Sequence, residues 1–130
     1  MPLTIQVVTP EREVEVANDV ELVIAKGVEG DVGIMPGHTP LLIALGLGPL
    51  TIVRAGGVRE VMAVDGGFLQ VSRDQVIVLA EYAVMPNEVV TADIDREIEE
   101  LRREVGDQAG DEGARRRLAR AEVIQSVAKM

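Results

Sequence analysis

The sequence predicts a mainly β protein with an α-helical tail: an N-terminal antiparallel β-sandwich, followed by a C-terminal helical hairpin. Apolar and polar residues alternate from Leu3 to about Pro86, which is the period of half-buried strands. After Asn87 the period changes to that of a helix, and no helical pattern precedes this point. We therefore expect a sandwich domain over residues 1–87 and a helical domain over residues 88–130.

Turn signals separate the predicted strands. They are Thr9-Pro10, Gly56-Gly57, Asp65-Gly66-Gly67 and Arg73-Asp74. Paired glycines suit the positive φ angles of tight hairpin turns. Short strands at this spacing are typical of an antiparallel sandwich or a flattened barrel.

The first tail helix is indicated by four apolar residues spaced by four, three and four positions, which lie on one helical face. These are Ile94, Ile98, Leu101 and Val105. Thr91 or Asp93 is a suitable N-cap for this helix, and Gly106 is expected to end it.

A second tail helix is expected from about Glu112 to Ala128, with Asp111 at its N-cap. Its apolar stripe is thin and rich in alanine. Short helices with few large apolar side chains are marginally stable in water. We therefore expect the hairpin to dock weakly on the sandwich and to be able to leave it.

Composition excludes several classes of partner. The chain has 13 basic and 22 acidic residues and a formal net charge of -9, which repels nucleic acid and anionic lipid. It has no cysteine, which favours a reducing compartment and leaves no disulfide or thiolate site. The most apolar stretch, Leu41 to Val53, is interrupted by two glycines and a proline and is too short for a membrane helix. We expect neither nucleic-acid binding nor direct insertion into lipid.

Catalytic patterns are missing from the sequence. His38 is the only histidine, so a multi-histidine metal site, as in a cupin-like barrel, is disfavoured, and a hydrogen-bonded structural role is expected for it. No glycine is followed by Lys and then Ser or Thr, as a phosphate-binding loop requires. Glu13 and Glu15 alternate with valines, as on a solvated strand face. We predict a non-catalytic protein with no metal and no cofactor.

The stretch ARRRLARA, residues 114–121, is the most basic part of the chain. Arg116 and Arg117 lie four and three residues before Arg120, so each shares a helix face with it. These arginines form either an ordinary solvated helix surface or a strip that seeks carboxylate or phosphate. The sequence pattern alone leaves both readings open.

Residues 30–42 read GDVGIMPGHTPLL and look like one restrained loop, because glycines permit positive φ while Pro36 and Pro40 fix φ. Residues 30–41 fit the pattern Gly-acid-x-Gly-x-x-Pro-Gly-His-x-Pro-Leu, and residues 66–71 fit Gly-Gly-Phe-Leu-x-Val. With these motifs and its charged two-helix tail, essentially the whole chain closely resembles the epsilon subunit of bacterial F-type ATP synthases.

The resemblance implies a sandwich of about ten strands. It also implies a non-catalytic rotor subunit that, with the gamma subunit, couples the membrane c ring to ATP synthesis in the catalytic head. It implies a position on the cytoplasmic side of the bacterial plasma membrane. By position in the family motif, Asp31 would contact the c ring, with His38 holding the loop at that interface. The alternative from the residues alone is a stand-alone acidic adaptor whose arginine-rich helix docks an acidic partner.

The resemblance also implies a mobile, regulatory tail. In the family the tail either folds on the sandwich or extends along gamma into the alpha/beta head and blocks ATP hydrolysis. The basic contact would be made here by Arg115, Arg116, Arg117 and Arg120. Some members bind ATP in the folded state, for which Asp95, Arg116 and Arg120 are the candidates. The family's ATP motif is degraded, because Ile98 and Glu99 stand where it has Arg and Ala, so we expect weakened ATP binding.

Overall fold

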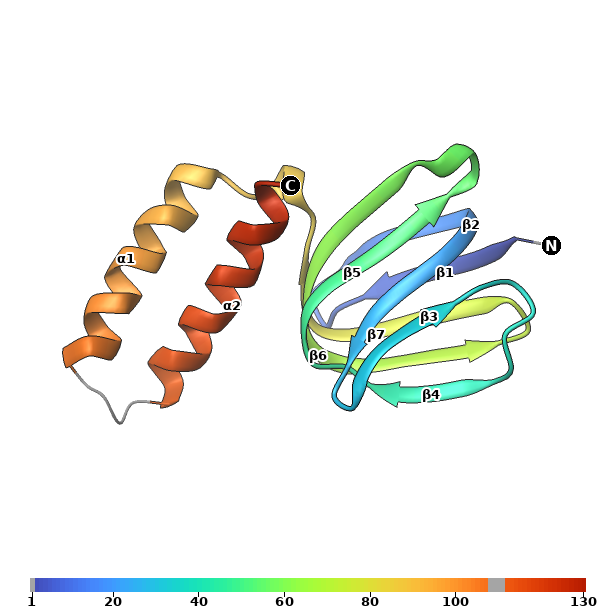
Figure 1. The fold of residues 1–130 in the computed structure, drawn as a ribbon, viewed down its shortest axis with the longest axis horizontal. Coiled ribbons are helices and arrows are strands. Elements are labelled where there is room, and N and C mark those ends of the chain that lie inside the picture. The colour runs from blue at the N-terminus through green and yellow to red at the C-terminus, as the bar shows by residue number, and fades with distance from the viewer. Residues whose placement is uncertain (1, 108–111) are drawn as a thin grey trace.

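The computed structural model describes residues 2–107 and 112–130 (Figure 1). The strands come first and the helices last, which confirms the predicted fold class. The strands are β1 (Leu3–Val8), β2 (Glu13–Gly27), β3 (Gly30–Ile34), β4 (Leu41–Ala44), β5 (Leu47–Arg54), β6 (Arg59–Ser72) and β7 (Gln75–Val84). The helices are α1 (Thr91–Asp107) and α2 (Glu112–Ala128), with short 3-10 turns η1 (Ala55–Gly57) and η2 (Pro86–Glu88).

The described residues form seven strands, where about ten were predicted. The difference arises because β2 and β6 run without a break for 15 and 14 residues. The hydrogen-bonded order is β1-β7-β6-β5-β2-β3, with β4 on β6, and β1 also pairs with β2. The sheet therefore closes on itself as a flattened barrel or sandwich. It is mixed rather than purely antiparallel, since β1 and β7 run parallel.

The predicted turn at Asp65-Gly66-Gly67 is wrong, because these residues lie inside β6. They change which face of the strand points inward: Met62 and Val64 are buried before them, and Leu69 and Val71 after them. Gly66 and Gly67 have φ of 74° and 106°. A Cβ on residue 67 would lie 2.0 Å from the Leu79 carbonyl oxygen, so only glycine fits this close strand approach.

Two separate apolar clusters stabilise the chain. The first fills the sandwich and draws on all seven strands, with Leu3, Ile5, Ile52 and Leu69 almost fully buried. The second lies between the hairpin and the sandwich, where helix residues such as Ile98 and Ala121 form one cluster with Ala63 of β6. The hairpin thus docks through an apolar cluster that is distinct from the core of the sandwich.

The helical hairpin lies to one side of the sandwich, with α2 between α1 and the strands (Figure 1). α1 begins at Thr91, so Val90 rather than Thr91 or Asp93 occupies the N-cap position. The Val90 carbonyl oxygen accepts the Ile94 N–H at 3.1 Å. The helix continues to Asp107, one residue past the predicted stop at Gly106. α2 has the predicted bounds, while its predicted cap, Asp111, lies outside the described residues.

Candidate functional site

The motif at residues 30–42 forms two strands with a turn between them, and the expectation of one continuous loop is wrong. Residues 30–34 are β3 because they pair with residues 23–27 of β2, and residues 41–44 are β4 because they pair with residues 68–71 of β6. Only residues 35–40 remain without regular structure. The glycines and prolines therefore serve the ends of strands as well as the turn.

The turn at residues 35–38 is restrained by hydrogen bonds at both of its sides. The His38 backbone N–H donates to the Met35 carbonyl oxygen at 3.1 Å, and Gly37 has φ of 85°, as a proline-glycine turn of type II requires. The Gly37 N–H donates to Asp74 Oδ1 at 2.6 Å. His38 Nδ1 lies 2.6 Å from the Thr39 carbonyl oxygen. The predicted hydrogen bonding of His38 is therefore confirmed, and its partner is the neighbouring backbone.

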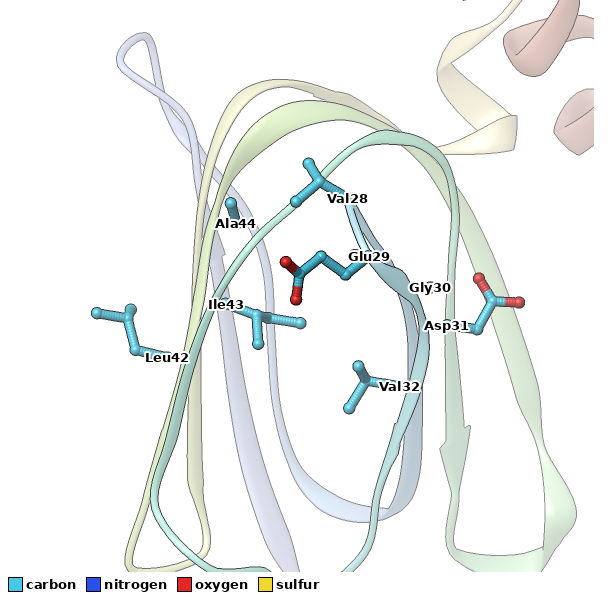
Figure 2. Close-up of a pocket in the computed structure, with 9 residues that line it drawn as sticks. Val28, Glu29, Gly30, Asp31, Val32, Leu42, Ile43 and Ala44 are labelled. Carbon is cyan, nitrogen blue, oxygen red and sulfur yellow. The ribbon is translucent and has the colours of Figure 1, made fainter.

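Asp31 lies near the other end of β3, beside the β2–β3 hairpin, so the structure does not bring Asp31 and His38 together. A hollow of about 380 Å³ opens there, lined by residues 27–32 and 42–44. Figure 2 shows Glu29, Val32 and Ile43 directed into this hollow, whereas the Asp31 carboxylate points away from it, and Asp31 is exposed. Asp31 is therefore an exposed charge at the end of the sandwich, free to meet another molecule.

An apolar patch covers part of the outer surface of the sandwich. Phe68 of β6 and Leu79 of β7 are directly paired across the two strands and are 54% and 55% exposed. Leu42 of β4 lies diagonally beside Phe68, because Leu42 pairs with Gln70, and is 67% exposed. We call these three residues the apolar outer face. Clustered exposed apolar side chains of this kind mark protein interfaces.

One arginine of the predicted basic strip is held by the sandwich. Arg120 Nε donates to Asp65 Oδ2 at 2.7 Å, and its guanidinium carbon lies 4.5 Å from the centre of the Tyr82 ring. Asp65 and Tyr82 are paired across β6 and β7, so both side chains project from the same face of the sheet. Burial raises the pKa of the Tyr82 hydroxyl, and the nearby positive charge of Arg120 partly opposes that shift. Asp65 and Tyr82 together form a receptor for a guanidinium group.

The sequence reasoning missed this receptor. Asp65 was interpreted as a turn residue, and Tyr82 as part of an alternating strand. The available signal was that Tyr82 is the only tyrosine in the chain and lies four positions before Pro86, at the end of the strand region. Spacing in the sequence could not show that Arg120 binds at this receptor, because Arg120 lies 55 residues from Asp65.

The other three arginines of the strip divide between two environments. Arg117 pairs with Glu104 of α1 at 2.9 Å. Arg115 and Arg116 are exposed and make no ion pair with any residue in the described ranges. In the docked state, one of the four arginines therefore pairs with the sandwich, one pairs within the hairpin, and two remain on the surface.

The ATP-binding candidates are not gathered into one site. Asp95 of α1 accepts hydrogen bonds from Gln125 at 2.6 Å and from Lys129 at 3.0 Å, and these two contacts, the first being the larger, lower its pKa. Arg116 is nine residues before Gln125 in the sequence, which is roughly 13 Å along the helix axis. The carboxylate of Asp95 is thus occupied at one end of α2 while Arg116 lies toward the other end.

The connection between sandwich and hairpin has an ion pair of its own. Arg12, in the β1–β2 loop, lies 2.7 Å from Glu88. Glu88 also accepts the Met85 N–H at 2.9 Å, which closes η2. The hydrogen bond from Arg12 is the main reason that the pKa of Glu88 is lowered.

Among the helices in the described ranges, none is long and apolar enough to span a membrane.

A sandwich with an exposed apolar face, an exposed acidic end and a separately packed helical arm defines a class of protein that works through contacts with other proteins. Residues 2–86 match the family described as "ATP synthase, Delta/Epsilon chain, beta-sandwich domain". The chain belongs to this ATP synthase family, whose epsilon members are non-catalytic central-stalk subunits of F-type ATP synthases. This assignment does not favour the alternative of a stand-alone adaptor.

Similar proteins cover both parts of the chain. The ATP synthase epsilon chain of Thermobifida fusca is 42% identical over 124 residues, covering 92% of this chain and 86% of that protein. That of Brevibacillus brevis is 45% identical over 87 residues, covering 67% of this chain and 65% of that protein. A chain in the mitochondrial ATP synthase structure (OSCP, F1 and c ring) of Euglena gracilis has the same fold, with a TM-score of 0.70 at 20% identity, covering 98% of this chain and 78% of that chain.

Proposed function

We propose that this chain binds the gamma subunit and the c ring through residues 1–87, and that its hairpin, residues 88–130, inhibits ATP hydrolysis when it leaves the sandwich and enters the alpha/beta head. The observation that carries the proposal is the pair of separate apolar cores. The sandwich keeps its complete core when the hairpin leaves, so the arm can move while the subunit stays bound to the rotor.

The gamma subunit is assigned to the apolar outer face. Leu42, Phe68 and Leu79 lie on three strands of one surface, farther along β6 than the residues that the hairpin covers. A partner on this face would leave the hairpin free to dock and undock. Burial of three large exposed apolar side chains also favours a lasting contact over a transient one.

The c ring is assigned to the end of the sandwich that carries Asp31. This carboxylate is exposed and points away from the hollow (Figure 2). His38 has a different part in this proposal. It is half-buried and bonded to the turn, so it holds the β3–β4 connection in shape and stays away from the ring contact itself.

The inhibitory contact is assigned to the four arginines between residues 115 and 120. Leaving the sandwich frees Arg120 from Asp65, and opening of the hairpin frees Arg117 from Glu104. Arg115 and Arg116 are already exposed. Four guanidinium groups on little more than one helical turn suit bidentate contacts with acidic segments of the head.

The bacterial relatives support a place on the cytoplasmic side of the plasma membrane, held there peripherally by the rotor. No cofactor is assigned. Regulatory binding of ATP is not part of the proposal, since Asp95 is engaged within the hairpin and the family's ATP motif is degraded.

The test is the ATP hydrolysis rate of the cognate alpha/beta head with gamma, rebuilt with the full chain or with residues 1–87. We expect several-fold faster hydrolysis with the truncated chain at equal gamma binding. The head rebuilt with a full chain carrying Arg115→Gln and Arg116→Gln should also hydrolyse ATP faster, because these exposed arginines make no ion pair with the sandwich within the described ranges and their loss should not release the hairpin. Equal rates for all three forms would refute an inhibitory tail.

The c-ring assignment is tested by ATP-driven ion pumping in the complete complex. Asp31→Asn should weaken coupling, whereas the matched variant Glu29→Gln, whose carboxylate points into the hollow, should leave it unchanged (Figure 2). An equal effect of both substitutions would contradict a specific contact at Asp31.

A further inference from the structure

Polar side-chain contacts are more numerous within the helical hairpin than between the hairpin and the strands. Three such contacts join α1 to α2, Arg102 with Glu122, Glu104 with Arg117, and Asp95 with Gln125, and a fourth joins Asp95 to Lys129 just after α2. Between these helices and the strands, within residues 2–107 and 112–130, the polar side-chain contact is that of Arg120 with Asp65. This unequal distribution points to undocking of the hairpin as a unit.

The Arg120 contact is better placed than an ordinary surface ion pair. The Asp65 side chain is only 21% exposed, and the Tyr82 ring provides an aromatic face for the guanidinium. Stacking of Arg on Tyr adds attraction to the charge pair. The neighbouring platform residues on β6 and β7, Val61, Ala63 and Val84, are apolar and bind the hairpin without any directional preference. Arg120 therefore determines the orientation in which α2 docks.

We propose that Asp65, Tyr82 and Arg120 form a latch that holds the hairpin on the sandwich and that keeps Arg120 from its inhibitory contact while the latch is closed. Docking and inhibition then compete for one guanidinium group. The competition between docking and inhibition rests on the proposed function, whereas the latch itself does not. The ion pair and the stacking together correspond to a roughly three- to thirtyfold bias toward the docked state.

The latch is tested with a single thiol in the full chain. The sequence has no cysteine, so Ala63→Cys introduces one reporter under the hairpin, at a site that is 2% exposed. A thiol reagent reaches this site only when the hairpin has undocked, so its labelling rate is proportional to the undocked population. Ala25→Cys, in the sandwich core and 1% exposed, reports global unfolding in a separate chain.

Asp65→Asn, added to the Ala63→Cys chain, should speed labelling about two- to fivefold, because it removes the charge pair and leaves the stacking. Arg120→Gln removes both contacts and should speed it roughly three- to thirtyfold. The matched control is Glu104→Gln, which breaks an ion pair of similar length between the two helices and should leave labelling unchanged. The Ala25→Cys chain should react far more slowly than the Ala63→Cys chain.

Three results would overturn the latch: no acceleration by Asp65→Asn, an equal acceleration by Glu104→Gln, or equal labelling of the Ala63→Cys and Ala25→Cys chains.

The competition for Arg120 is tested separately in the rebuilt head. Asp65→Asn should slow ATP hydrolysis, since the hairpin is released with Arg120 intact. If truncation at residue 87 has no effect on hydrolysis, the proposed function fails, and the labelling result still decides on the latch. If truncation speeds hydrolysis while Asp65→Asn leaves it unchanged, the competition is refuted.

Discussion

Replacing Gly67 by alanine tests the strand geometry that positions Asp65 under the hairpin and Phe68 on the apolar outer face. The new Cβ would lie 2.0 Å from the Leu79 carbonyl oxygen and 2.8 Å from the Ala80 Cα, both of them backbone atoms. Overpacking of this kind costs about 1–3 kcal/mol, and a positive φ in a non-glycine residue costs about 1–2 kcal/mol. We therefore expect Gly67→Ala to lower the free energy of unfolding by about 2–5 kcal/mol.

Gly37→Ala is the matched control for this prediction. Gly37 also has a positive φ, 85°, but a Cβ there would meet no atom within 4 Å. Only the backbone cost of about 1–2 kcal/mol applies to it. Urea unfolding of the full chain, followed by circular dichroism, measures both variants. A loss for Gly67→Ala no larger than that for Gly37→Ala would refute the close approach of β6 and β7.

Three further predictions concern the hairpin, its connection and the turn. Arg12→Gln should lower the free energy of unfolding at about pH 7, because it removes the ion pair with Glu88. This difference in free energy from wild type should vanish as the pH falls below 4.5 and through the lowered folded-state pKa of Glu88, which unfolding at several pH values would measure. Ile98→Ala, at a site that is 1% exposed, should weaken hairpin packing by about 2–5 kcal/mol, so that hydrogen exchange quickens in the helices while amides of the sandwich core stay protected. Asp74→Ala should quicken exchange of the Gly37 amide, which loses its acceptor, whereas Asp74→Asn should preserve it.

The sign of the pH effect follows from the direction of the pKa shift. Glu88 is easier to ionise in the folded chain than in the unfolded chain, because its carboxylate accepts a hydrogen bond from Arg12. Its contribution to stability is therefore complete above the unfolded pKa and disappears on acidification. A difference between wild type and Arg12→Gln that grows at low pH would contradict this role.

The proposed latch connects the stability of hairpin docking to the proposed inhibition of ATP hydrolysis. Docking depends on an apolar platform, which confers affinity, and on one guanidinium receptor, which confers orientation. A contact of this strength can be exchanged for a similar contact on another protein, since the free energies involved are small compared with those of the sandwich core. The arm can then respond to the state of the complex without unfolding of the subunit.

Much of the architecture follows from the sequence through local periodicity. The alternation up to Pro86 indicated strands, and the spacing of Ile94, Ile98 and Leu101 indicated a helix, because a side chain's position within one element depends on its near neighbours in the chain. The long glycine-proline motif and the resemblance that it carries indicated the family. The bounds of α2 were also predicted correctly.

The tertiary structure alone decided which distant residues meet. Gly66 and Gly67 look like a turn in the sequence, and only the pairing of β6 with β7 shows that they instead reverse the faces of a continuous strand. That reversal leaves Asp65 on the hairpin side and Phe68 on the apolar outer face. Asp65, Tyr82 and Arg120 come together across 55 residues, because strand pairing and helix docking bring together parts of the chain for which the sequence carries no common period.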